Sequence, residues 1–92
     1  MTPSELIQHR IVTLVELLLK VRGPKKIDLA HQLGIDAAQL SHRLKGRDRF
    51  QVHEVVYLAL YYELPTDVFL LQSPERKALI DELAGEAIAR AR

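Results

Sequence analysis

Two short helical patterns joined by a single glycine constrain the fold of this chain more than any other feature. The first pattern covers roughly residues 25–33 and the second covers residues 37–45. Gly34 stands between them, where a left-handed residue is usual, and Asp36 is a good N-cap for the second pattern. Ala30 is small enough to let two helices pack closely. The sequence therefore predicts a sharp corner between two short helices.

The remainder of the chain also has the pattern of helices. Strand-like alternation does not occur, and turn signals separate segments of helical period. Thr2, Thr66 and Ser73 are placed to cap helices, and Gly23-Pro24 is placed to end the first one. We therefore expect an all-α fold of five or six helices, with the others near residues 2–22, 51–63, 67–71 and 74–91.

Two of these expected helices carry apolar residues that bear on packing. On the helix at residues 51–63 we expect these side chains to be largely buried: Val52, Val55, Val56, Leu58, Ala59 and Leu60. The last helix has a regular apolar stripe, formed by Leu79, Ile80, Leu83, Ala87 and Ile88. Such a stripe is typical of a partner surface, so we expect a main domain at residues 1–72 and a homodimerisation element at residues 73–92. The alternative is that this helix folds back beside the first helix and completes the core.

Charge is distributed unevenly along the chain, although the net charge is only +1. Residues 20–49 hold eight basic and three acidic side chains, which gives +5. Residues 50–86 hold two basic and seven acidic side chains, which gives −5. A compact fold of such a chain has a basic face and an acidic face, and the basic face is a candidate anion-binding surface. A solvated surface of uneven charge is the alternative.

Several classes of function find no support in the sequence. The chain has no cysteine, which excludes disulfides and thiolate metal sites, and its four histidines show no ligand spacing. It has no nucleophile motif, no paired carboxylates and no glycine-rich phosphate loop, and Glu54 is better explained as a first-turn cap. No signal peptide or membrane span is recognisable. We expect no enzyme activity, cofactor, metal site or small-molecule ligand.

The paired helices at residues 25–33 and 37–45 match the helix-turn-helix arrangement. In that arrangement the second helix lies in the major groove of DNA and the first crosses the backbone. The outer face of the second helix has no large apolar group, as a groove-reading face requires. Phosphate contacts come from basic and hydroxyl side chains, and the candidates are Lys25, Ser41, Lys45, Arg47 and Arg49.

A longer pattern surrounds this motif, made of Leu29-Ala30, Gly34, Ser41, Gly46-Arg47, the apolar texture of Val55 to Leu60, and Leu64-Pro65. With this pattern, residues 26–71 resemble the Cro/repressor-type helix-turn-helix family, often called XRE. The resemblance covers about half of the chain and implies a lambda-repressor-like fold that binds operator DNA. It also implies that Lys26, at the start of its helix, contacts a phosphate.

Two departures from the family pattern bear on base recognition. Position 43 is often apolar in that family and is arginine here, with Leu44 taking up the burial. Positions 37 and 38 often carry longer polar side chains and are alanine here, placed to lie against thymine methyls or to permit close approach. Gln39 is suited to adenine and Arg43 to guanine. The candidate base contacts are Ala37, Ala38, Gln39, His42 and Arg43.

These observations predict a transcriptional repressor that binds a palindromic operator in double-stranded DNA as a homodimer. Its expected location is the cytoplasm or nucleoid of a bacterial host cell, and a phage Cro or immunity repressor fits this expectation. One alternative is an antitoxin-like module that also binds a toxin through its acidic C-terminal half. Another is a protein-interaction adaptor that has lost DNA binding, which the two alanines favour and the clustered basic residues oppose.

Overall fold

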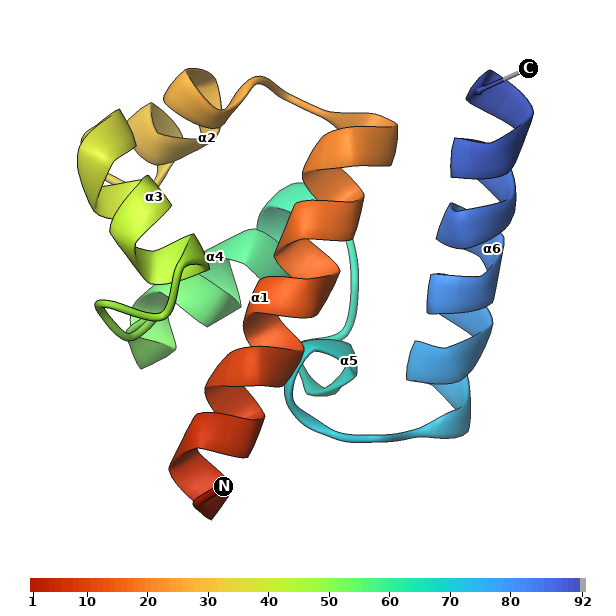
Figure 1. Ribbon diagram of the computed structural model, residues 1–92, viewed down its shortest axis with the longest axis horizontal. Helices are drawn as coiled ribbons and strands as arrows, with labels where there is room; N and C mark the ends of the chain where they lie inside the picture. Colours follow the sequence, from red (N-terminus) through yellow and green to blue (C-terminus); the bar gives the residue numbers. More distant parts are fainter. Residues whose placement is uncertain (92) are drawn as a thin grey trace.

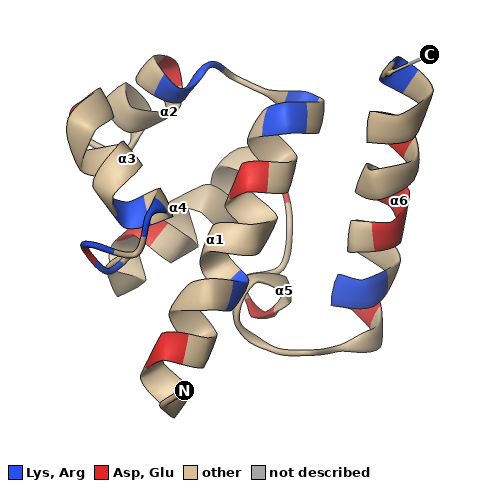
Figure 2. Ribbon diagram, in the orientation of Figure 1, with Lys and Arg blue, Asp and Glu red and all other residues tan. Residues whose placement is uncertain are grey.

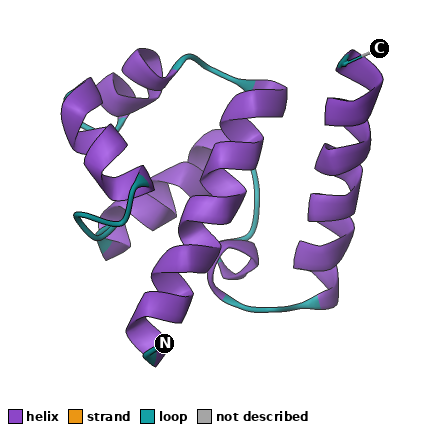
Figure 3. Ribbon diagram, in the orientation of Figure 1, coloured by secondary structure: helices purple, strands orange, loops and turns teal. Residues whose placement is uncertain are grey.

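Six helices and their connecting turns form the computed structural model, which describes residues 1–91 and has no strand in that range (Figure 3). None of the described helices is both long and apolar enough to cross a membrane. The predicted all-α fold is confirmed, and each helix lies within one or two residues of its expected place. The helices are α1 (Pro3–Arg22), α2 (Lys26–Gln32), α3 (Ala37–Leu44), α4 (Val52–Tyr62), α5 (Asp67–Leu70) and α6 (Pro74–Arg90).

The starts of the three best-defined helices follow from their capping residues. The side chains of Thr2, Asp36 and Ser73 each accept a hydrogen bond from a backbone N–H in the first turn of α1, α3 and α6. Each such cap is worth about 1 kcal/mol of helix stability. The cap expected from Thr66 is wrong, because this residue has helical backbone angles and makes no capping hydrogen bond to α5.

A glycine with positive φ follows each of the two short helices α2 and α3. Gly34 follows α2 with a φ of 75°, and Gly46 follows α3 with a φ of 80°. A side chain at this backbone conformation is strained, because Cβ approaches the neighbouring carbonyl oxygen. These two glycines therefore mark the ends of α2 and α3, as the sequence predicted for Gly34.

The α1 helix runs through the middle of the molecule, with α2 and α3 on one side and α6 on the other (Figure 1). Five of its side chains are buried, and they join a single apolar core to which every helix contributes. The fully buried side chains of this core with the largest volumes are Phe69, Ile11, Leu14, Leu18, Leu29, Leu40, Leu58 and Leu83. The breadth of the apolar surface of α1 is explained, because it packs against helices on two sides.

The α6 helix belongs to this core, which corrects the expected dimerisation stripe. Leu83 is fully buried and Leu79 is 9% exposed, while Ile80 and Ala87 pack against the core at its edge. Only Ile88 of the five stripe residues is freely exposed. Figure 1 shows α6 lying alongside α1 and running in the same direction. The apolar stripe thus covers α1 of its own chain, and α6 completes the core, as the alternative interpretation held.

A buried arginine anchors the first turn of α6. The guanidinium of Arg76 donates one hydrogen bond to the carbonyl oxygen of Val68 at 2.6 Å and another to that of Arg10 at 3.0 Å. Arg10 in turn donates to the carbonyl oxygen of Leu70 at 2.9 Å. Burial, and then the charge of Arg10, lower the pKa of the Arg76 guanidinium below its ordinary value. These bonds join α1, α5 and α6 at one point and fix the direction in which α6 leaves α5.

Tyrosine hydroxyl groups tie α4 to its neighbours. The Tyr62 hydroxyl donates to the carbonyl oxygen of Gly23 at 2.7 Å, where α1 ends. Burial of this hydroxyl, with a smaller effect from Tyr61, raises the pKa of Tyr62 to about 12. The Tyr57 hydroxyl donates to Gln32 at 2.9 Å, where α2 ends. The two bonds tie α4 to the end of α1 and to the end of α2.

The apolar residues of α4 are not all buried, contrary to the expectation from the sequence. Val55, Leu58 and Ala59 lie in the core, but Val52 is 82% exposed and Leu60 is 71% exposed. Val56, at 42%, is also exposed. The physical reason is geometric, because a helix on the edge of a small domain can turn only one side toward the core. The expectation for Val52, Val56 and Leu60 was therefore wrong.

The packing of α6 leads to a test of stability. Replacing Leu83 with alanine should lower the free energy of unfolding by about 2 to 5 kcal/mol, because it removes a fully buried side chain and leaves a cavity. The matched change Ile88→Ala, on the exposed end of the same helix, should change it by no more than about 0.5 kcal/mol. Urea unfolding followed by circular dichroism measures both. Equal, small effects would contradict the burial of the α6 stripe.

Candidate nucleic-acid interface

The α2 and α3 helices meet at a close corner. Leu29 and Ala30 on α2 and Leu40 on α3 are fully buried, so both helices are pinned to the core by their inner sides. Ile35, in the turn between them, donates its backbone N–H to the carbonyl oxygen of Ala30 at 3.0 Å. The predicted glycine corner is confirmed in its geometry, and it holds α3 at the surface in one orientation.

A reciprocal cap fixes the start of α3. The Asp36 carboxylate accepts a hydrogen bond from the backbone N–H of Gln39 at 2.7 Å, and the Gln39 amide oxygen accepts one from the backbone N–H of Asp36 at 2.9 Å. This capping box satisfies two groups that a free helix end leaves open. Because α3 has only eight residues, the cap is important for keeping it helical without a partner.

The outward face of α3 carries small and polar side chains. Ala38 and Gln39 are exposed, and Ala37, Ser41 and His42 are half-buried. Lys45 follows at the C-terminal end of the helix and is exposed. No side chain on this face is both apolar and larger than alanine, because Leu40 and Leu44 point inward. The face can therefore approach another surface closely, because no large apolar side chain stands between them.

The loop after α3 is held in place through α1. The Gln8 side chain donates to the carbonyl oxygen of Phe50 at 3.1 Å and accepts from its backbone N–H at 2.8 Å. Phe50 itself is buried beside Val55, as a hydrophobic staple at the start of α4 requires. This pair of bonds fixes the end of the loop, so the arginines that precede Phe50 lie next to the end of α3.

Basic residues stand at the two ends of the segment that holds α2 and α3, namely at the start of α2 and after α3. Figure 2 shows blue segments at the start of α2, at the end of α3 and in the following loop, whereas red segments recur along α6. The exposed members of this basic group are Lys25, Lys26, Lys45, Arg47 and Arg49. They include every candidate phosphate contact except Ser41, which is half-buried on α3 itself. The structure therefore brings these candidates to the region around α3.

Arg43 has a different role from the one expected of it. Its Nε donates to the carboxylate of Glu54 at 2.9 Å, and only 12% of its side chain is exposed. Its Nη1 lies 3.4 Å from the carbonyl oxygen of Gln39 within the same helix. Glu54 is 2% exposed and cannot be left without a cation. We therefore withdraw the expected guanine contact and assign Arg43 to the ion pair.

The remaining base-contact candidates differ in how free their polar groups are. The amide oxygen of Gln39 is used in the capping box, so the two-bond pairing with adenine expected of it would require that cap to open. His42 lies with Nδ1 at 3.7 Å from a carboxylate oxygen of Asp48, and its side chain is 45% exposed. Ala38 is open to contact by its methyl group. His42 and Ala38 are thus the candidates least occupied within the chain.

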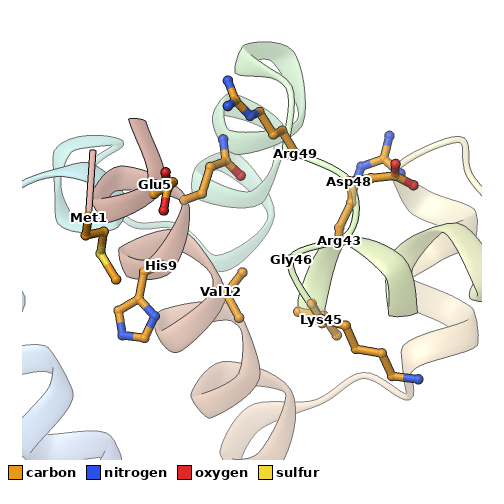
Figure 4. A pocket seen from close by; sticks show the side chains of 11 residues that line it. Met1, Glu5, His9, Val12, Arg43, Lys45, Gly46, Asp48 and Arg49 are labelled. Carbon is orange, nitrogen blue, oxygen red and sulfur yellow. The ribbon is translucent and has the colours of Figure 1, made fainter. Parts of the chain in front are cut away.

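A hollow of about 510 Å³ lies between the first half of α1 and the end of α3. Figure 4 shows Glu5 and His9 on the α1 side, and Lys45, Asp48 and Arg49 on the other side. Two carboxylates therefore lie among its basic groups. Because acidic and basic side chains are mixed in its lining, this hollow is not a continuous positive surface on which a polyanion could bind. The basic surface lies on its α3 side.

Two residues with important positions were not singled out from the sequence. Gln8 reads as an ordinary exposed helix residue, although its two bonds to Phe50 hold the loop. Glu54 was expected to cap α4, and it does accept from the backbone N–H of Gln51 at 2.8 Å, but its pairing with Arg43 was not foreseen. An available signal was the arginine at position 43, followed by a carboxylate in the first turn of the next helix.

No protein-family model, curated protein or solved structure matches this chain. Within residues 1–91, no group of three or more histidine or acidic side chains is placed to hold a metal ion. The interface is therefore interpreted from its own geometry.

The Arg43–Glu54 pair can be tested by measuring coupling. Arg43→Met should lower the free energy of unfolding by about 3 kcal/mol, because it leaves a buried carboxylate unpaired. In a Glu54→Gln background, which keeps an acceptor for Gln51, the same change should cost about 1 kcal/mol or less. The matched control Arg49→Met removes an exposed arginine and should be nearly neutral. Equal costs for Arg43→Met in the two backgrounds, measured by urea unfolding, would contradict the assignment.

Proposed function

We propose that this protein is a sequence-specific DNA-binding transcriptional repressor of the helix-turn-helix class, in which α2 and α3 form the motif and residues 37–45 read operator DNA. A repressor of the Cro or phage-immunity type, acting in the cytoplasm or nucleoid of a bacterial cell, fits the resemblance drawn from residues 26–71. Repression would follow from occupation of a promoter, because the bound protein excludes the transcription machinery from the same DNA.

The observation that carries the proposal is the outward face of α3. This face is held rigid by a capping box and has no large apolar group, and the segment from α2 to the loop after α3 carries five exposed basic side chains. The major groove of B-DNA is about 12 Å wide and admits one α-helix. A smooth, polar helix followed by a basic loop is suited to that groove and to the phosphates along its edges.

The lysines at the start of α2 add an electrostatic argument. Lys25 is the N-cap residue and Lys26 the first residue of α2, and no side chain caps this end. Positive charges at the positive end of a helix dipole are unfavourable by about 0.3 to 1 kcal/mol each. An adjacent phosphate would interact favourably with both the lysines and the helix N-terminus. Asp28 in the same turn offsets part of this cost in the free protein, and the two exposed lysines favour an anionic partner.

Affinity and specificity would come from different groups. The exposed lysines and arginines would bind phosphates of any sequence and release counterions, which makes binding strongly dependent on salt. Ala38 and His42 would contact base edges, with the alanine methyl placed against a thymine methyl group. Arg43 contributes indirectly by holding α3 against α4. With so few base contacts, we expect modest discrimination from one copy and hence the use of a two-fold operator.

The antitoxin alternative gains no support from the arrangement of α6. It requires the acidic C-terminal half to offer an apolar surface to a toxin. Leu79 and Leu83 are instead packed on α1, and Arg22 at the end of α1 lies 3.7 Å from Glu82 and 3.8 Å from Glu86. These ion pairs are exposed and contribute little stability, but they cover part of the acidic surface.

The phosphate contact assigned to Lys26 can be tested with a matched lysine on the other side of the molecule. Lys26→Ala should weaken binding to any duplex and lower the slope of log affinity against log salt by about one unit. Lys77→Ala, an exposed change on α6, should leave the slope unchanged. Fluorescence anisotropy with a duplex of random sequence at several salt concentrations measures both slopes.

The outcome is interpretable because Lys26→Ala should not weaken the fold. Removing a cation from the start of α2 should leave the free energy of unfolding unchanged or slightly raised. Equal slopes for Lys26→Ala, Lys77→Ala and the unaltered protein would exclude Lys26 from the DNA interface.

A further inference from the structure

The outer side of α4 is an exposed, mainly apolar helix face that the proposed DNA interface does not use. Six of the eleven residues of α4 are exposed, namely Val52, His53, Val56, Tyr57, Leu60 and Tyr61. Five of these six side chains are apolar or aromatic, and none is acidic, lysine or arginine. The one acidic residue of α4, Glu54, is buried. A face of this composition on a protein surface indicates contact with a partner.

The composition of the face favours a second copy of the same chain as that partner. In a two-fold contact, identical surfaces meet, so any net charge on the surface would repel itself. The exposed residues of the α4 face include no lysine, arginine or acidic side chain, and the face therefore pairs with itself without repulsion. A strongly acidic or basic partner would find no complementary charge there. Tyrosines with apolar neighbours and few charges are also typical of the centres of protein interfaces.

The shape of the face also fits self-association. Val52 and Leu60 project from α4, being 82% and 71% exposed. Beside them lies a small hollow of about 130 Å³ between α1, α4 and α5, lined almost entirely by apolar side chains, including those of Ile7, Val56 and Leu70. A two-fold interface requires a self-complementary surface, and a face that holds both a projection and a recess can meet that requirement. Here the projection Val52 itself stands at the edge of the recess.

We propose that the protein forms a homodimer through the outer face of α4, with Val52, Val56 and Leu60 at its centre. This inference rests on the proposed function in one respect only: the palindromic operator of that proposal requires two copies of the protein. It replaces α6 as the dimerisation surface.

The size of the face sets the expected strength of the dimer. A patch of this kind covers on the order of a few hundred Å² on each copy, below the roughly 800 Å² per partner of a standard stable interface. The dimer should therefore be weak in solution and favoured by high protein concentration. Binding of two copies to adjacent half-sites would raise their effective concentration and stabilise the same contact.

The experiment is sedimentation equilibrium without DNA, from about 10 µM to about 1 mM protein, the range in which a small interface dissociates. The unaltered protein should pass from monomer to dimer across this range. Leu60→Glu and Val52→Glu should each raise the dissociation constant at least about tenfold, because each buries an unpaired charge in the contact. Both positions are exposed in the monomer, and circular dichroism should show unchanged helix content.

The matched control is Ile88→Glu, which introduces the same charge at an exposed apolar position on α6. It should dimerise as the unaltered protein does. A protein that stays monomeric at the highest concentration would overturn the proposal, and so would dissociation by Ile88→Glu but not by Leu60→Glu. Because DNA takes no part in the measurement, failure here leaves the DNA-binding proposal standing. A protein that dimerises as expected but binds no DNA would contradict the DNA-binding proposal and leave the dimer proposal standing.

Discussion

The buried carboxylate of Glu54 is the constraint on which the candidate interface depends. A charge with 2% exposure requires partners, and Glu54 finds them in the backbone N–H of Gln51 and the guanidinium of Arg43. The first bond starts α4, and the second ties α3 to α4 across the intervening loop. Because Arg43 is drawn inward, the outer face of α3 is left to Ala38, Ser41 and His42. One ion pair thus sets both the position of α3 and the side chains that α3 can offer.

Local signals in the sequence predicted most of the fold. Helix ends are determined within a few residues of chain, by caps such as Asp36 and Ser73 and by glycines such as Gly34, so they can be recognised without the structure. The tight corner between α2 and α3 follows from the same signals. The exposure of the basic side chains was also foreseeable, because long charged side chains are rarely buried without a partner.

Which partner each surface meets could not be predicted from local signals. The apolar pattern of α4 and that of α6 look alike in sequence, yet Leu83 is fully buried and Leu60 is 71% exposed. The difference is decided by the path of α5 and the anchor at Arg76, which turn α6 onto α1. The role of Arg43 was missed for the same reason. Its partner lies eleven residues away, in a helix whose orientation the sequence does not specify.

Selection of bound fragments from random double-stranded DNA tests the central claim most directly, because the operator sequence need not be known to perform it. A two-fold repressor should enrich a short motif in two inverted copies, with half-site centres about one helical turn, roughly 34 Å, or a multiple of it apart. The enriched fragments should also bind more tightly than random DNA at the same salt concentration. Recovery of fragments with no common motif, or no retention of DNA even at low salt, would contradict the proposed function.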